Sequence, residues 1–94
     1  MIHELLMVGE ENAKTARDLA RIVGTKPREI SRMIERERRQ GKTICASVNS
    51  KKPGYFLPKD KADFAAYCRR LEHRYKEVGI TLMACEESLE GMDA

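Results

Sequence analysis

Basic side chains gather in one short stretch of this sequence, and they are the residues best suited to bind a ligand. Seven lysines and arginines lie between Lys26 and Lys42, where three glutamates leave a local excess of four positive charges. The stretch from Glu86 to Asp93 instead carries four acids and no base. Clustered ammonium and guanidinium groups attract phosphates. The charge pattern therefore predicts that the basic stretch meets a polyanion and that the acidic stretch does not.

The cysteines and histidines do not have the spacing of a catalytic or metal site. Cys45, Cys68 and Cys85 are odd in number and far apart, so we expect buried free thiols rather than disulfides or zinc ligands. His3 and His73 each lack a second ligand nearby in the sequence. The sequence also contains no Ser-His-Asp or Cys-His arrangement and no glycine-rich phosphate loop. We therefore expect no enzymatic activity, no metal and no cofactor.

Size and composition fit one small domain. The chain has 94 residues, of which 35% are charged, and a mean hydropathy of -0.57. No apolar run is long enough to span a membrane. The stretch from Met1 to Val8 lacks the basic flank and the length of a signal peptide. We expect a soluble, cytoplasmic protein.

Three short helices are predicted before residue 42, and their signals are apolar spacing, caps and glycines. Their expected limits are Met1 to Val8, Thr15 to Gly24 and Thr25 to Gly41. Thr15 and Thr25 are suitable N-caps, and Pro27 fits a first helical turn because its missing N–H costs nothing there. The basic residues would then lie mainly on the third helix.

A β-hairpin is predicted next. Thr43 to Val48 and Tyr55 to Leu57 have strand composition, and the turn from Asn49 to Gly54 contains Lys51 and Lys52. The pattern therefore indicates a hairpin with a basic tip.

A long helix is predicted from the cap Asp60 onward, with a seven-residue apolar pattern. Phe64, Leu71, Val78 and Cys85 lie in one register, and Cys68, Tyr75, Leu82 and Leu89 in the other. An unbroken helix would be about 40 Å long, but Gly79 is a weak point that leaves two shorter helices as an alternative. The apolar stripe is longer than a small core requires, which favours a homodimer built from this helix, alone or together with the first.

The second and third predicted helices have the spacing of a helix-turn-helix. Such a motif needs a small residue at the helix crossing, a glycine in the turn and apolar residues that lock the second helix. Ala20, Gly24, Ile30 and Met33 stand at the required offsets.

The stretch from Thr15 to Pro58 resembles the winged helix-turn-helix domains of bacterial regulators, such as the N-terminal domain of biotin operon repressors. It also resembles small winged-helix proteins of phages and mobile elements. The matching motifs are Ala16-x-x-Leu19-Ala20-x-x-x-Gly24, Arg28-x-Ile30-x-x-x-Ile34 and Gly54-Tyr55-x-Leu57-Pro58. A ligase domain is not present in this sequence, so no biotin chemistry is carried over. The resemblance implies a winged fold that binds DNA through the third helix and the wing.

The predicted fold is therefore α+β and mainly α: a winged helix-turn-helix with a three-helix core, a β-hairpin wing and a long C-terminal helix. We expect residues 1–59 to form the core, 60–90 the C-terminal helix and 91–94 a frayed tail. The predicted partner is double-stranded DNA. The expected DNA-binding residues are Thr15, Thr25, Lys26, Arg28, Ser31, Arg32, Arg36, Lys51 and Lys52. The expected dimerisation residues are Phe64, Cys68, Leu71, Tyr75, Val78 and Leu82.

Three other interpretations stay open. The basic helix face could simply be solvated, with Glu29 and Glu35 pairing with neighbouring arginines. The chain could be a winged-helix interaction or assembly module of a phage or mobile-element complex, using its last helix and acidic tail. It could also be a ligand-sensing or redox-sensing regulator that uses one of its cysteines. The preferred hypothesis is a dimeric transcription regulator whose recognition helices lie about 34 Å apart on a palindromic site.

Overall fold

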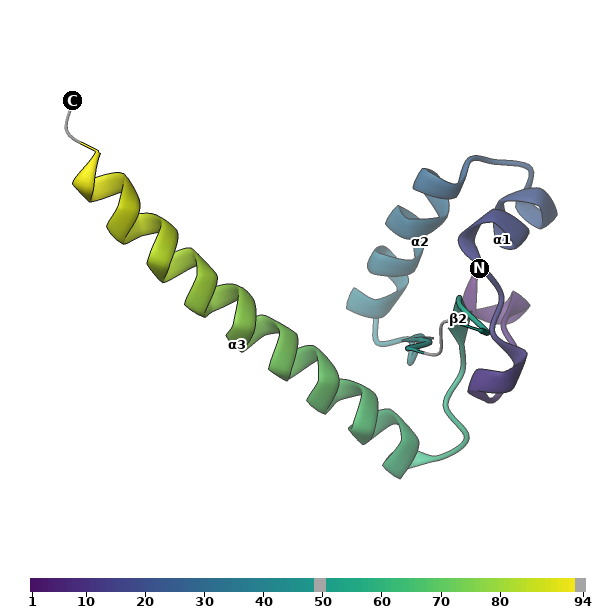
Figure 1. Ribbon diagram of the computed structural model, residues 1–94. Helices are drawn as coiled ribbons and strands as arrows, with labels where there is room; N and C mark the ends of the chain where they lie inside the picture. The colour runs from purple at the N-terminus through teal and green to yellow at the C-terminus, as the bar shows by residue number, and fades with distance from the viewer. Residues whose placement is uncertain (49–50, 93–94) are drawn as a thin grey trace. The chain divides into compact units, whose positions relative to one another are not determined.

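The computed structural model describes residues 1–48 and 51–92 of the chain. These residues form two compact units, Met1–Phe64 and Ala65–Ala94. The elements in chain order are two 3₁₀ turns, His3–Leu5 and Glu10–Asn12, then α1 (Ala16–Val23), α2 (Pro27–Arg39), β1 (Cys45–Ala46), β2 (Tyr55–Phe56) and α3 (Lys61–Gly91) (Figure 1). The described chain is therefore mainly α, with a small antiparallel sheet and a long C-terminal helix. Asp93 and Ala94 of the predicted tail lie outside the described residues.

The first predicted helix is wrong, because the N-terminal segment forms only the 3₁₀ turn His3–Leu5. No side chain caps the segment, and its backbone bonds distant partners instead, since the Ile2 amide donates 2.8 Å to the Glu37 carboxylate. Here Leu6 becomes extended instead, with φ -89° and ψ 149°. The chain then reaches the hairpin, where the Leu57 amide donates to the Met7 carbonyl and the Gly9 amide donates to the Leu57 carbonyl, both at 2.9 Å.

Helix α1 has the limits that its capping residues predicted. The Thr15 hydroxyl accepts a 3.0 Å hydrogen bond from the Asp18 amide, which satisfies one of the free donors at the helix start. Gly24 ends the helix in the left-handed region, with φ 83°. The sequence prediction for this helix is confirmed.

Helix α2 begins one residue later than an N-cap at Thr25 would set it. Its N-cap is Lys26, which makes no capping bond through its side chain, so the prediction of Thr25 as the cap is wrong. The Thr25 amide instead donates 2.9 Å to the Ala20 carbonyl and closes the turn after α1. Pro27 occupies the first turn of α2, as expected. Gly41 lies just beyond the helix end with φ 96°.

The hairpin is present but its strands are shorter than the sequence suggested. Cys45 pairs with Phe56 and Ala46 with Tyr55 in antiparallel register. Tyr55 also exchanges backbone hydrogen bonds of 2.8 and 2.9 Å with Lys14, which precedes α1. The return strand thus pairs on both sides within the N-terminal unit. Asn49 and Ser50 of the predicted turn lie outside the described residues.

The core of the N-terminal unit lies between α1, α2, the hairpin and the N-terminal segment. Its fully buried side chains are contributed by all of these elements: Ile2, Leu19, Ile30, Ile34, Ile44 and Cys45. Leu19 of α1 and Ile30 and Ile34 of α2 therefore pack in the same cluster. This packing fixes which side of α2 faces outward.

Helix α3 runs without a break from Lys61 to Gly91, through Gly79. The Asp60 carboxylate accepts a 2.8 Å bond from the Asp63 amide, which confirms Asp60 as the cap. Cys68 and Cys85 are exposed on this helix, so the prediction of buried thiols is correct for Cys45 and wrong for these two. Among the described residues of α3, only Tyr67 is buried.

Candidate nucleic-acid interface

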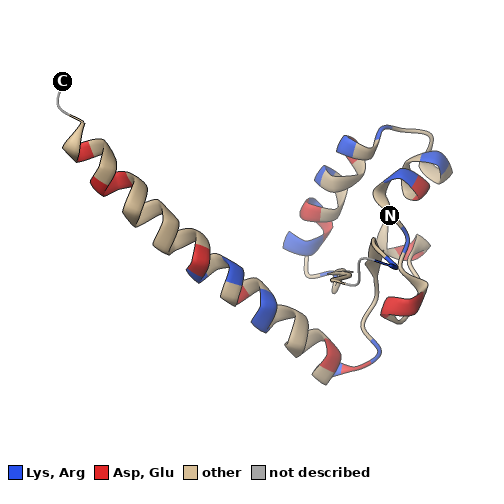
Figure 2. Ribbon diagram, viewed as in Figure 1, with Lys and Arg blue, Asp and Glu red and all other residues tan. Residues whose placement is uncertain are grey.

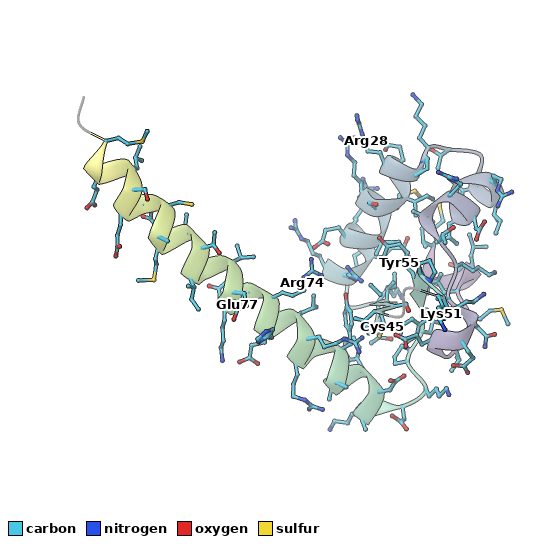
Figure 3. The ribbon with its side chains drawn as sticks, viewed as in Figure 1. Arg28, Cys45, Lys51, Tyr55, Arg74 and Glu77 are labelled. Atoms are coloured by element: carbon cyan, nitrogen blue, oxygen red, sulfur yellow. The ribbon has the colours of Figure 1, made fainter. Side chains whose placement is uncertain are left out.

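The outward side of α2 is basic and accessible. Ile30 and Ile34 are buried and set the inward side of the helix. The remaining predicted contact residues on and just before this helix are all exposed: Lys26, Arg28, Ser31, Arg32 and Arg36. Figure 2 shows Lys and Arg along α2, and Figure 3 shows Arg28 pointing away from the unit near the start of the helix. Five of the nine predicted DNA-binding residues therefore share one exposed region.

The charges in this region are only partly neutralised. A guanidinium nitrogen of Arg32 lies 3.1 Å from a Glu29 carboxylate oxygen. Lys26, Arg28 and Arg36 have no acidic partner among the residues that the structure describes. The predicted pairing with a glutamate is thus present for Arg32 and absent for these three residues. They can each approach an anion without first losing an ion pair.

Arg38 has a structural position and does not belong to the exposed basic region. Its Nε donates 3.0 Å to the Ile44 carbonyl, and its guanidinium lies 5.9 Å from the centre of the Tyr55 ring. These contacts join the end of α2 to the hairpin. They hold the basic helix against the sheet.

The two threonines proposed for phosphate contacts differ from each other. Thr15 is half-buried, and its hydroxyl already caps α1. Thr25 lies in the turn and starts no helix, so the expectation that it brings a helix N-terminus to a phosphate is wrong. Only Thr15 keeps the position from which backbone amides of α1 could face an anion.

The two lysines of the hairpin form a separate basic group. Lys51 and Lys52 are both exposed. In Figure 3, Lys51 lies on the hairpin near Tyr55, well apart from Arg28 at the start of α2. The structure therefore places the predicted basic residues in two groups, one on and just before α2 and one on the hairpin.

Glu37 is a charged residue of α2 whose partners the sequence did not reveal. Its carboxylate is buried and accepts bonds from the backbone amides of Ile2, at 2.8 Å, and His3, at 3.0 Å. The His3 ring Nδ1 and the N-terminal ammonium lie 2.8 and 3.3 Å away. Burial acts to raise the pKa of Glu37, but these hydrogen bonds outweigh it and lower the pKa from 4.5 to about 2. The signal in the sequence was an acid on an otherwise apolar face.

The predicted dimerisation residues lie on α3 and are mostly accessible. Phe64 is half-buried, whereas the other five are exposed, including 80% of Tyr75 and 67% of Val78. Exposed apolar side chains in a continuous row indicate an interaction surface. They do not identify what covers it.

Metal-ligand clusters and membrane-spanning helices are the two other kinds of feature compared with the described part of the chain. Residues 1–48 and 51–92 contain no cluster of three potential metal ligands. None of the helices described is long and apolar enough to cross a membrane.

Comparison with known proteins adds no family to these observations. No family model matches the chain, and neither the curated proteins nor the solved structures include a match.

Proposed function

We propose that this chain is a winged helix-turn-helix protein that binds double-stranded DNA as a homodimer and regulates transcription. In this proposal α2 lies in the major groove, and the hairpin acts as a wing on the flanking backbone. The exposed apolar residues of α3 join two copies.

The local geometry from α1 to the hairpin supports the winged helix-turn-helix assignment. Gly24 takes the left-handed conformation between the two helices, and Ala20 is buried where α1 meets the turn. Ile30 is fully buried and packs α2 against the core. The small residue, the turn glycine and the apolar anchor therefore have the roles that this motif requires.

The observation that carries the proposal is the set of uncompensated cations on α2. Lys26, Arg28 and Arg36 are exposed without acidic partners in the described chain. An α-helix fits the major groove, and its first two turns reach base edges. Arg28 is placed to contact a guanine edge or a phosphate, and Arg36 to contact a phosphate farther along the helix.

Fluorescence anisotropy with a labelled random duplex tests the proposal. The wild type should bind with an affinity that falls steeply as salt rises, because bound phosphates release counterions. The double variant Arg28→Ala/Arg32→Ala should bind about tenfold more weakly or worse. Lys59→Ala/Lys61→Ala removes two exposed charges at the start of α3, outside the proposed interface and the residues proposed to join two copies, and is the matched control. Equal losses in both variants, or no binding at low salt, would reject a specific role for α2.

A second candidate function is supported by α3. Its exposed apolar residues are also what a protein-interaction or assembly module of a phage or mobile-element complex would present. In that case the basic side of α2 would be solvated and dispensable. Partner capture that survives Arg28→Ala/Arg32→Ala, combined with absence of DNA binding in the wild type, would favour this candidate.

A further inference from the structure

One side of α3 carries apolar residues that are spaced alternately four and three residues apart. We call them the seam: Phe64, Cys68, Leu71, Tyr75, Val78, Leu82, Cys85, Leu89 and Met92. This average spacing of 3.5 residues keeps a stripe facing a second helix along its whole length. From Cys68 onward every seam residue is exposed, including 69% of Leu89. A stripe of this length suits a long helical partner.

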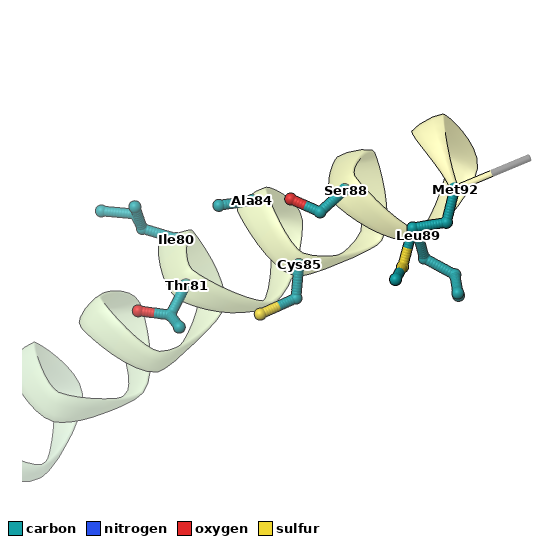
Figure 4. A pocket seen from close by; sticks show the side chains of 7 residues that line it. All are labelled: Ile80, Thr81, Ala84, Cys85, Ser88, Leu89 and Met92. Atoms are coloured by element: carbon teal, nitrogen blue, oxygen red, sulfur yellow. The ribbon is translucent and has the colours of Figure 1, made fainter.

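The C-terminal half of the seam borders a shallow hollow on the helix surface. Figure 4 shows the side chains around it, among which Cys85, Leu89 and Met92 belong to the seam and Ile80 and Ala84 do not. Hollows between rows of side chains on a helix are the places that side chains of a second helix fill. Residues 78–85 contain no charged side chain, so this part of α3 offers a hydrophobic contact.

A row of side chains beside the seam has opposite charges at its two ends. The row follows the same alternate spacing and contains Arg69, Glu72, Lys76, Gly79, Met83, Glu86 and Glu90. Arg69 and Lys76 make its beginning positive, and the two last glutamates make its end negative. Figure 2 shows the same polarity for α3 as a whole, with Lys and Arg only in its N-terminal half. Two copies of the row are complementary when one of them is reversed.

We propose that the partner of α3 is the α3 helix of a second copy of this chain, in antiparallel orientation. Reversal places Arg69 beside Glu90 of the partner copy and Lys76 beside its Glu86. In a parallel pair, the row on one side of the seam would meet the row on the other side of the partner's seam. That orientation would bring Arg69 and Lys76 near Arg74 of the second copy. The inference rests on the homodimer of the proposed function and does not depend on DNA binding.

The exposed part of the seam, from Cys68 to Met92, is matched along its whole length in one register of the antiparallel pair. Aligning the two copies about the level of residue 80 gives four kinds of apolar layer, each formed twice. The layers are Cys68 with Met92, Leu71 with Leu89, Tyr75 with Cys85, and Val78 with Leu82. Glu72 and Glu86 of the partner copy also approach each other, but Glu72 lies 3.1 Å from its neighbour Lys76, which offsets this repulsion.

Cross-linking of chains that each carry one exposed cysteine tests the orientation. One full-length chain carries Cys68→Ser and keeps Cys85, and a second carries Cys68→Ser/Cys85→Ser/Tyr75→Cys; both retain the buried Cys45. With a short bismaleimide, the antiparallel pair should give a covalent dimer only when the two chains are mixed. Positions 85 and 85, like 75 and 75, would lie about 15 Å apart along the axis. In a parallel pair each chain would cross-link with itself.

The outcomes separate this inference from the proposed function. Cross-linking of each chain alone would overturn the antiparallel orientation and leave the homodimer intact. Absence of any dimer in sedimentation of the wild type would overturn both. DNA binding is measured separately by anisotropy.

Charge reversal gives a second test that does not depend on introduced cysteines. Glu86→Lys/Glu90→Lys should weaken self-association of the full chain by roughly tenfold at low salt, because like charges then meet at both ends. Adding Arg69→Glu/Lys76→Glu to the same chain should restore the wild-type dissociation constant. Failure of the second pair to rescue the first would contradict the proposed contacts. Sedimentation equilibrium provides the measurement, and circular dichroism checks that each variant stays folded.

Discussion

The carboxylate of Glu37 on α2 accepts a 2.8 Å hydrogen bond from the backbone amide of Ile2, thirty-five residues earlier in the chain. This bond and its neighbours tie the N-terminal segment to the helix that carries the exposed basic residues. The position of that helix is thus supported on its inward side by an ionised group.

The stability of the N-terminal unit should depend on the ionisation of Glu37. Because the folded-state pKa is lowered from 4.5 to about 2, the stabilisation is complete above the unfolded-state value and is lost as the pH falls toward 2. A shift of this size corresponds to about 3 kcal/mol. We expect Glu37→Gln to lower the free energy of unfolding by about 2 to 3 kcal/mol at pH 7, and by progressively less below pH 4.5.

Urea denaturation followed by circular dichroism at several pH values measures this difference. Glu35→Gln, at an exposed position of the same helix, is the control and should change the free energy of unfolding little. A Glu37→Gln effect that is independent of pH would contradict the role of the charge.

Gly54 should not tolerate a side chain. An added Cβ would lie 2.3 Å from the Lys14 carbonyl oxygen, and the residue has a φ of 127°. Gly54→Ala should therefore destabilise the unit by about 3 kcal/mol through both the clash and the backbone strain. Gly24→Ala is the matched comparison: φ is 83° but no atom lies within 4 Å, so the loss should be about 1 kcal/mol. Thermal or urea unfolding measures both losses of stability. Equal losses for Gly54→Ala and Gly24→Ala would show that Gly54 does not lie in close contact with Lys14.

Helix α3 should become more stable when Gly79 is replaced by alanine. Gly79 is inside a continuous helix, and nothing lies within 4 Å of an added Cβ. Gly79→Ala should increase helix stability by about 1 kcal/mol, because glycine has the larger conformational entropy to lose. Protection of the α3 amides in hydrogen exchange should rise accordingly, while that of α1 and α2 stays unchanged. A decrease would indicate that α3 bends at this residue.

The sequence predicted best those features that neighbouring residues determine. Thr15 and Gly24 define α1 through bonds within a few residues, and Asp60 caps α3 in the same way. The prediction of an N-terminal helix failed because the conformation of that segment depends on bonds to Glu37 and Leu57, which are distant in sequence. The limits of the hairpin likewise depend on Lys14, which pairs with Tyr55.

The candidate interface was predictable in part for the same reason. Helical periodicity identified which side of α2 carries Arg28, Ser31 and Arg36. Periodicity alone did not indicate that Lys26 replaces Thr25 as the helix start. It also gave no sign that Cys68 and Cys85 are exposed in a single chain, since an apolar stripe looks alike whether it packs within one chain or between two.

The ion pair between Glu29 and Arg32 should compete with DNA. The two side chains lie 3.1 Å apart on the proposed binding surface, so the carboxylate repels phosphates and restrains the guanidinium. Exposed pairs of this kind are worth about 0.2 to 1 kcal/mol. Glu29→Gln should therefore tighten binding to a random duplex at low salt by about two- to fivefold. Glu77→Gln, an equal change of charge on α3, should leave the affinity nearly unchanged. Anisotropy titrations measure the DNA affinity of both variants. Equal affinities of Glu29→Gln and Glu77→Gln would mean that α2 does not face the phosphates.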